Sequence, residues 1–197
     1  MEDAISEAVV QRVLRENRQQ YATVTIYNRG GNGYLQRVIA GFNNAAKGTA
    51  FLVLTDLDKH ECPATLVADW LNVPKHPNLL LRVAVTEVEA WLLADRQGIA
   101  TFLGVRPDLV PQGVEQLPDP KQILISLACK SRKREIKKDI CPGVNSARKV
   151  GPNYNPQLVK FVEYNWNLVE ARTNSESLNR LIEKLENFQP TYNQQNN

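Results

Sequence analysis

Residues 50–58 read Ala-Phe-Leu-Val-Leu-Thr-Asp-Leu-Asp, a short apolar run that ends in two aspartates separated by one residue. A continuous apolar run of this length is typical of a β-strand that is buried on both faces of a parallel sheet. A second such run, Leu79 to Val85, is followed by a helical pattern from Glu87 to Asp95. We therefore expect an α/β fold, with Asp56 and Glu87 beyond the carboxyl ends of the strands, where ligands of such sheets bind.

Helices and strands are expected to alternate on both sides of this stretch. Apolar residues at helical spacing predict a helix over Glu2 to Asn17, and the β-branched run Ala22 to Tyr27 predicts a strand. The glycine-rich segment 30–33 that follows lacks the spacing of a P-loop or a dinucleotide fold, so we interpret it as a flexible turn. Helices at Tyr34 to Ala46 and Cys62 to Leu71 would flank a mostly parallel sheet.

The second half of the chain has a different pattern. Beyond Gly104, prolines punctuate the loops, and helices are expected at Asp119 to Lys130, Pro156 to Asn165 and Ser175 to Phe188. We interpret residues 1–104 as an α/β core, residues 105–189 as a helical subdomain packed on that core, and residues 190–197 as a disordered tail.

Composition restricts the class of protein. The chain has 197 residues, 43% of them hydrophobic, which is enough apolar material for one core. Its apolar runs fall far short of the ~20 residues of a membrane span and no cationic-then-apolar leader is present, so we expect a cytoplasmic protein without a membrane partner. Cys62, Cys129 and Cys141 are odd in number and widely spaced, which favours reduced thiols over a disulfide framework or a zinc site.

The two aspartates of the first stretch suggest a metal site. Side chains two residues apart point the same way while the backbone stays extended, so Asp56 and Asp58 could face one cation. Mg²⁺ typically takes one or two carboxylates and keeps water for a substrate phosphate. The pattern alone also fits a phosphate-receiver domain, an Asp-x-Asp transferase, or a plain turn at Asp58.

Several segments together carry a resemblance to a known family. Residues 2–8 read Glu-Asp-Ala-Ile-Ser-Glu-Ala, like the first glutamate motif of TOPRIM domains, and residues 54–58 resemble their Asp-x-Asp motif. Residues 85–95, 149–154 and 171–178 resemble segments of the TOPRIM-like proteins catalogued as domain of unknown function 4276. That family is related to the TOPRIM domains of nucleases of the overcoming-lysogenization-defect type. The resemblance spans nearly the whole chain and implies a TOPRIM-like sheet.

The resemblance also implies roles for individual acidic residues. The implied catalytic residues are Glu2, Glu7, Asp56 and Asp58, and the implied ligands of Mg²⁺ or Mn²⁺ are Glu2, Asp56, Asp58, Glu87 and Glu89. TOPRIM domains have an apolar strand before the first glutamate, whereas only Met1 precedes Glu2 here. We therefore expect either a gene start upstream or a sheet without that strand. The structural alternatives are a solvated helix face for Glu7 and a helix-surface or capping role for Glu89.

A basic segment extends from Lys130 to Lys149. Candidates for contacts with nucleic-acid phosphates are Lys130, Arg132, Lys133, Arg134 and Lys149, and the alternative is a solvated helix face.

The expected function is a Mg²⁺- or Mn²⁺-dependent nuclease that cleaves DNA or RNA. By resemblance it would be an effector in prokaryotic defence, with an ABC-like or AAA ATPase as partner. The alternative is a non-catalytic TOPRIM-like module that binds such an ATPase or nucleic acid. Whether the protein forms a homo-oligomer is left open.

Overall fold

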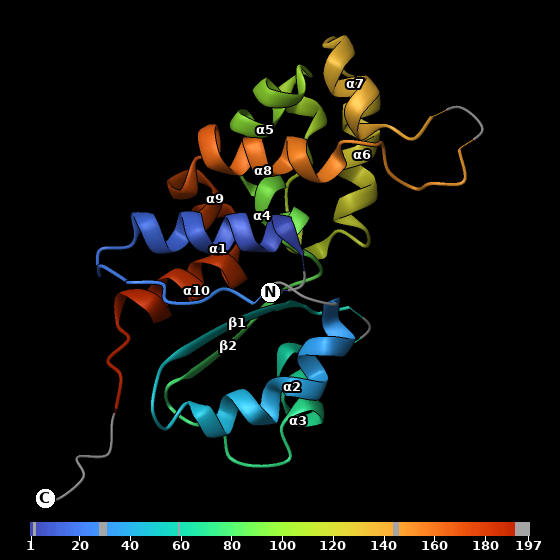
Figure 1. Ribbon diagram of the computed structural model, residues 1–197. Helices are drawn as coiled ribbons and strands as arrows, with labels where there is room; N and C mark the ends of the chain where they lie inside the picture. The colour runs from blue at the N-terminus through green and yellow to red at the C-terminus, as the bar shows by residue number, and fades with distance from the viewer. Residues whose placement is uncertain (2, 28–30, 59, 144–145, 192–197) are drawn as a thin grey trace, which may run out of the picture.

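The computed structural model describes residues 1, 3–27, 31–58, 60–143 and 146–191 (Figure 1). Its sheet has two parallel strands, β1 (Phe51–Asp56) and β2 (Leu79–Ala84). Phe51 pairs with Leu79 at one end, and Asp56 pairs with Ala84 at the other. The predicted parallel α/β sheet is confirmed, with two strands among the described residues.

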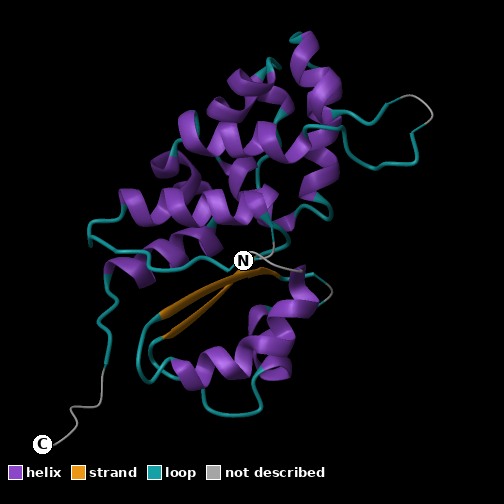
Figure 2. Cartoon of the chain, viewed as in Figure 1, coloured by secondary structure: helices purple, strands orange, loops and turns teal. Residues whose placement is uncertain are grey.

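Helices cover both faces of the sheet (Figure 2). On one face lie α2 (Gly31–Ala45) and α3 (Pro63–Trp70), whose apolar residues pack against the odd-numbered residues Leu79 and Leu81 of β2. The opposite face carries Leu80 and Ala84, which belong to the larger apolar core. That core contains residues of α1 (Ala4–Glu16), α4 (Val88–Ala94) and α10 (Glu176–Glu186).

The helices of the second half enclose α4. They are α5 (Arg96–Leu103), α6 (Pro120–Cys129), α7 (Arg134–Ile140), α8 (Tyr154–Tyr164) and α9 (Leu168–Asn174). Two short 3₁₀ turns cover Pro107–Leu109 and Val114–Gln116. Each residue of α4 is buried, and Trp91 lies in the core with its Nε1 donating to Ser177 Oγ (2.8 Å). Since α1 packs on α8, elements of the first and second halves of the chain share one apolar core.

The strand predicted over Ala22 to Tyr27 is wrong. This segment has no ladder partner among the described residues, and Val24 is 93% exposed. A β-branched run fits a pleated sheet surface, but it becomes a strand only where a neighbour accepts its backbone hydrogen bonds. Here the Tyr27 carbonyl accepts a hydrogen bond from the Met1 amino group (3.0 Å).

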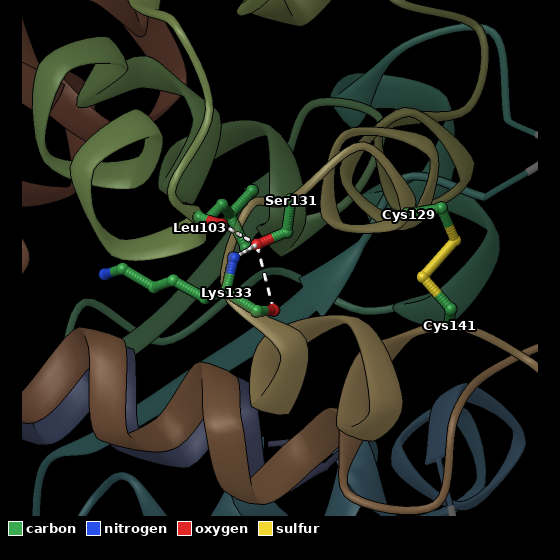
Figure 3. Close-up of a disulfide and its surroundings, with 5 residues drawn as sticks. All are labelled: Leu103, Cys129, Ser131, Lys133 and Cys141. Atoms are coloured by element: carbon green, nitrogen blue, oxygen red, sulfur yellow. Dashed lines mark hydrogen bonds between the residues drawn. A yellow bond between two sulfur atoms is a disulfide. The ribbon is translucent and has the colours of Figure 1, made fainter.

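The expectation of reduced cysteines is wrong for two of the three. Cys129, at the end of α6, and Cys141, just after α7, form a disulfide with a Cα–Cα distance of 5.6 Å (Figure 3). The turn between the helices brings them together, since the Ser131 hydroxyl donates to the Leu103 carbonyl and accepts from Lys133 N (2.9 Å). Wide sequence spacing therefore did not keep the thiols apart. Cys62 is free and exposed.

Other expectations concern the end of the chain and the membrane. Thr191 N donates to Asn78 Oδ1 (2.8 Å), which ties the start of the predicted tail to the sheet, and residues 192–197 lie outside the described part. Within the described ranges, no helix combines the length and the apolar character needed to cross a bilayer.

Candidate functional site

Asp56 links the end of β1 to the start of α4. Its Oδ1 accepts a hydrogen bond from the N–H of Val88 (3.0 Å), the first residue of that helix. Because Asp56 pairs with Ala84 in the ladder, both strands end at this point. The Asp-x-Asp segment and the Glu-x-Glu segment therefore meet at the carboxyl edge of the sheet. We call Asp56, Asp58, Glu87 and Glu89 the acidic edge.

Thr86 makes the turn between β2 and α4 with a positive φ of 59°. A β-branched residue rarely adopts this left-handed conformation, and such strain costs about 1–3 kcal/mol. Its Oγ1 is buried and has no hydrogen-bond partner among the described residues. Strain and an unsatisfied hydroxyl thus occur together beside Asp56 and Glu87.

Asp58 does not continue the strand. The N–H of Leu57 donates to the carbonyls of Ala84 (3.0 Å) and Thr86 (3.3 Å), and the chain then turns at Asp58 with a φ of 50°. The argument from side-chain alternation therefore does not apply at this position. The Asp58 carboxylate accepts a hydrogen bond from the side-chain amide of Asn32, in the first turn of α2.

Glu87 occupies the N-cap position of α4 and reaches the start of α6. Its Oε2 accepts a hydrogen bond from Lys121 N (3.1 Å). Burial raises the pKa of the Glu87 carboxyl, the charges of Glu89 and Asp119 raise it further, and the bond from Lys121 opposes them. The described surroundings of Glu87 therefore disfavour its charged form.

Glu89 is buried beneath this edge, with only 4% of its surface exposed. Its Oε1 accepts a hydrogen bond from Tyr154 Oη (2.9 Å) and lies 3.6 Å from Lys121 Nζ. Lys121 Nζ also lies 5.3 Å from the centroid of the Tyr154 ring. The pKa of Tyr154 is raised by burial first, then by the charges of Glu89, Glu87 and Asp3, so the phenol remains a proton donor to Glu89.

Sequence reasoning did not assign Asp3, Lys121 and Tyr154 to the site. Asp3 caps α1 by accepting from Ser6 N (2.8 Å), and its charge acts on Tyr154. Tyr154 ends the segment 149–154 that carries part of the resemblance, and Lys121 follows the cap Asp119 of α6. The resemblance of residues 149–154 and the helix cap Asp119 could have drawn attention to Tyr154 and Lys121. Nothing in the sequence, however, shows that these two side chains contact Glu89.

The remaining implied acidic residues are placed differently. Glu2 lies outside the described residues. Glu7 lies in the first turn of α1, where its Oε1 accepts from Gln11 Nε2 (3.0 Å). Among the described residues, no group of three or more His, Cys, Asp or Glu side chains is arranged to hold a metal ion. The described part of the acidic edge is thus not a complete metal site, and we derive no chemical step through a metal.

The basic candidates lie on two segments: Lys130 to Arg134 span the end of α6 and the start of α7, and Lys149 precedes α8. All are exposed: Lys130, Arg132, Lys133, Arg134 and Lys149. Figure 1 shows α7 at one end of the molecule, with α6 between α7 and the sheet. Helix α6 connects the two regions, and its 10 residues span about 15 Å. Lys133 also has a structural contact, because its Nζ donates to the carbonyls of Thr101 (2.9 Å) and Phe102 (3.0 Å) at the end of α5.

Comparisons of the chain with protein-family models, with curated proteins and with solved structures gave no match.

Proposed function

We propose that this chain is a TOPRIM-like phosphodiesterase that uses Mg²⁺ or Mn²⁺ to cleave nucleic acid. The observation that carries the proposal is the bond between Asp56 Oδ1 and Val88 N, which brings both acidic segments to the carboxyl edge of a parallel sheet. Ligands of open α/β sheets bind at this edge. The buried hydroxyl of Thr86, which has no hydrogen-bond partner in the described part of the chain, supports a ligand there, because buried polar groups are normally satisfied.

The chemistry of the donor set is consistent with a hard cation. Carboxylates held near one another favour a positive ion between them, and a cation stabilises the charge that builds on oxygen during phosphodiester cleavage. In this proposal Asp56 and Asp58 are ligands with Glu2, and Glu87 and Glu89 support them. Lys121, at the same edge, would contact a substrate phosphate. A role in prokaryotic defence beside an ABC-like or AAA ATPase rests on the resemblance alone.

The test is cleavage of labelled single-stranded DNA, double-stranded DNA and RNA by the full chain, with Mn²⁺, Mg²⁺ or EDTA. Asp56→Asn should abolish cleavage, because it removes the charge while its amide oxygen can still accept the bond from Val88. The matched control is Asp108→Asn, since Asp108 is exposed and pairs with Arg106 at the surface. Equal metal-dependent cleavage by wild type and Asp56→Asn would overturn the proposal.

A second candidate is a non-catalytic module that binds nucleic acid or a partner ATPase. It is favoured by the observation that the described residues contain no complete group of metal ligands. Calorimetric titration with Mn²⁺ separates the two candidates. Heat of binding that disappears in Asp56→Asn supports the nuclease, whereas nucleic-acid binding without carboxylate-dependent metal uptake supports the module.

A further inference from the structure

The outer edge of β2 is open among the described residues. Phe51 N donates to the Asn78 carbonyl and Leu57 N to the Ala84 carbonyl, so the even-numbered residues of β2 face β1 in this ladder. The N–H and C=O groups of Leu81 and Val83 consequently point away from β1. Within the described ranges these groups have no hydrogen-bond partner, and such an edge is a template for another strand.

A cleft of about 490 Å³ includes this edge, and side chains of α3 and α10 line it. The apolar side is formed by Val67 and Leu71 with Leu81, on the sheet face that α3 covers. The cationic residues of the lining are Lys75, Arg82 and Arg180, and none of the described residues that line the cleft is acidic. The cleft thus combines an open backbone edge, an apolar side and a cationic lining.

Arg82 is the residue that most needs a partner. Its Nε is buried and has no hydrogen-bond acceptor among the described residues, and burial lowers its pKa. The pKa of Lys75 is lowered by burial and then by the charges of Arg82 and Lys184. Arg180 is largely exposed and pairs with Glu176 at the surface. A carboxylate would satisfy the guanidinium, because the planar Arg fork matches carboxylate oxygens.

We propose that the open edge of β2 binds an extended peptide segment with alternating acidic and apolar residues, added to the sheet as a further strand. Successive side chains of an added strand point to opposite faces of the sheet. On one face they would meet the apolar side of α3. On the other they would meet Arg82, which shares its face with Leu80 and Ala84 and lies near α10.

The charge of the cleft selects this occupant over a second copy of the chain. Pairing two β2 edges would place the half-buried Arg82 and the other cations of the two clefts at one interface, and like charges across an interface oppose association. An acidic segment instead neutralises Arg82 and gains main-chain hydrogen bonds, as in other cases of strand addition. This binding surface is independent of the acidic edge, so it does not depend on the nuclease proposal.

The probe is a fluorescein-labelled, terminally blocked peptide Val-Glu-Val-Glu-Val-Glu, whose length matches the 6 residues of β2. Its binding to the full chain is measured by fluorescence anisotropy. Two control peptides replace each Glu with Lys, or carry N-methyl groups on alternate amides. We expect the acidic peptide to bind and both controls to bind at least tenfold more weakly.

The protein variants are Arg82→Gln and Arg180→Gln, with Arg37→Gln as the matched control because Arg37 is exposed on α2. Loss of a hydrogen bond to a charged group predicts about tenfold weaker binding for Arg82→Gln, with unchanged binding for Arg37→Gln. Arg180→Gln should weaken binding less. If Arg82→Gln does not fold, as judged by circular dichroism, Arg180→Gln and the N-methyl peptide decide the question.

Three results would overturn the inference: no binding of the acidic peptide at millimolar concentration, equal binding of the lysine peptide, or equal binding of the N-methyl peptide. A stable dimer in sedimentation equilibrium that excludes the peptide would also overturn it, in favour of a second copy at this edge.

Discussion

Tyr154→Phe tests the buried network behind the acidic edge. The variant removes the hydroxyl that donates to Glu89 Oε1 (2.9 Å) and changes little else in volume. Glu89 is 4% exposed and would retain Lys121 Nζ at 3.6 Å as its nearest cation. A hydrogen bond to a charged group contributes about 1.5–3 kcal/mol, so we expect that loss in the free energy of unfolding.

For a chain of this size, that loss corresponds to a fall of about 3–12 °C in the melting temperature. The assay is urea unfolding followed by circular dichroism and tryptophan fluorescence, with Glu89→Gln and the double variant completing a double-mutant cycle. The cycle should return a coupling energy above ~1 kcal/mol, because the two groups act through one bond. Equal effects of Tyr154→Phe in the wild-type and Glu89→Gln backgrounds would refute the network.

Three further predictions concern stability. Burial raises the pKa of Glu87, so its charged form costs stability as the pH rises through the folded-state pKa. Glu87→Gln should therefore have a higher melting temperature than wild type at pH 8. A difference in melting temperature that persists well below the ordinary pKa of 4.5 would contradict this reasoning. Gly151→Ala would place a Cβ 2.4 Å from a backbone oxygen, so we expect a loss of about 1–3 kcal/mol by urea unfolding, whereas Gly41→Ala, with open space around it, should not destabilise. Cys141→Ser opens the 12-residue loop to Cys129 and should lower the free energy of unfolding by about 3 kcal/mol without reductant. With reductant, wild type and variant should have the same melting temperature, and a difference under that condition would show that the loss has another cause than the disulfide.

The parts of the fold that local pattern determines could be predicted from the sequence. The apolar runs at residues 50–55 and 79–85 became β1 and β2, because a mostly apolar run can be buried on both faces of a sheet even where it contains one Arg, as at Arg82. Helix α10 was expected from its cap Ser175 and its apolar stripe. The prediction of a strand at residues 22–27 was wrong, since a strand needs a hydrogen-bonded neighbour, which the local pattern does not specify.

The site residues also divide into those whose position follows from local pattern and those whose contacts depend on tertiary packing. That Asp56 lies at the end of a strand follows from the pattern, and the structure places it there. The contact of Glu89 with Tyr154 joins residues 65 positions apart, and it depends on how α8 packs against α4. The Cys129–Cys141 bond also depends on a tertiary feature, the turn through Ser131 that reverses the chain between α6 and α7. Neither contact has a local sequence signature.

The acidic edge is held in place by the starts of helices rather than by side-chain packing alone. Asp56 accepts from the first N–H of α4, Glu87 accepts from Lys121 N in the first turn of α6, and Asp3 caps α1. N–H groups at helix starts stabilise carboxylates, which accounts for the positions of Asp56 and Glu87, whereas Asp58 and Glu89 accept from the side chains of Asn32 and Tyr154. Under the proposed function, a divalent ion at the acidic edge would compete with these backbone donors for the oxygens of Asp56 and Glu87. This competition predicts that metal affinity is low when the edge is empty of substrate, and that it rises when a nucleic-acid phosphate supplies further oxygen ligands. Mn²⁺ titrations with and without a non-cleavable oligonucleotide analogue measure the difference, and equal affinity in both would rule out a metal ion shared with the substrate.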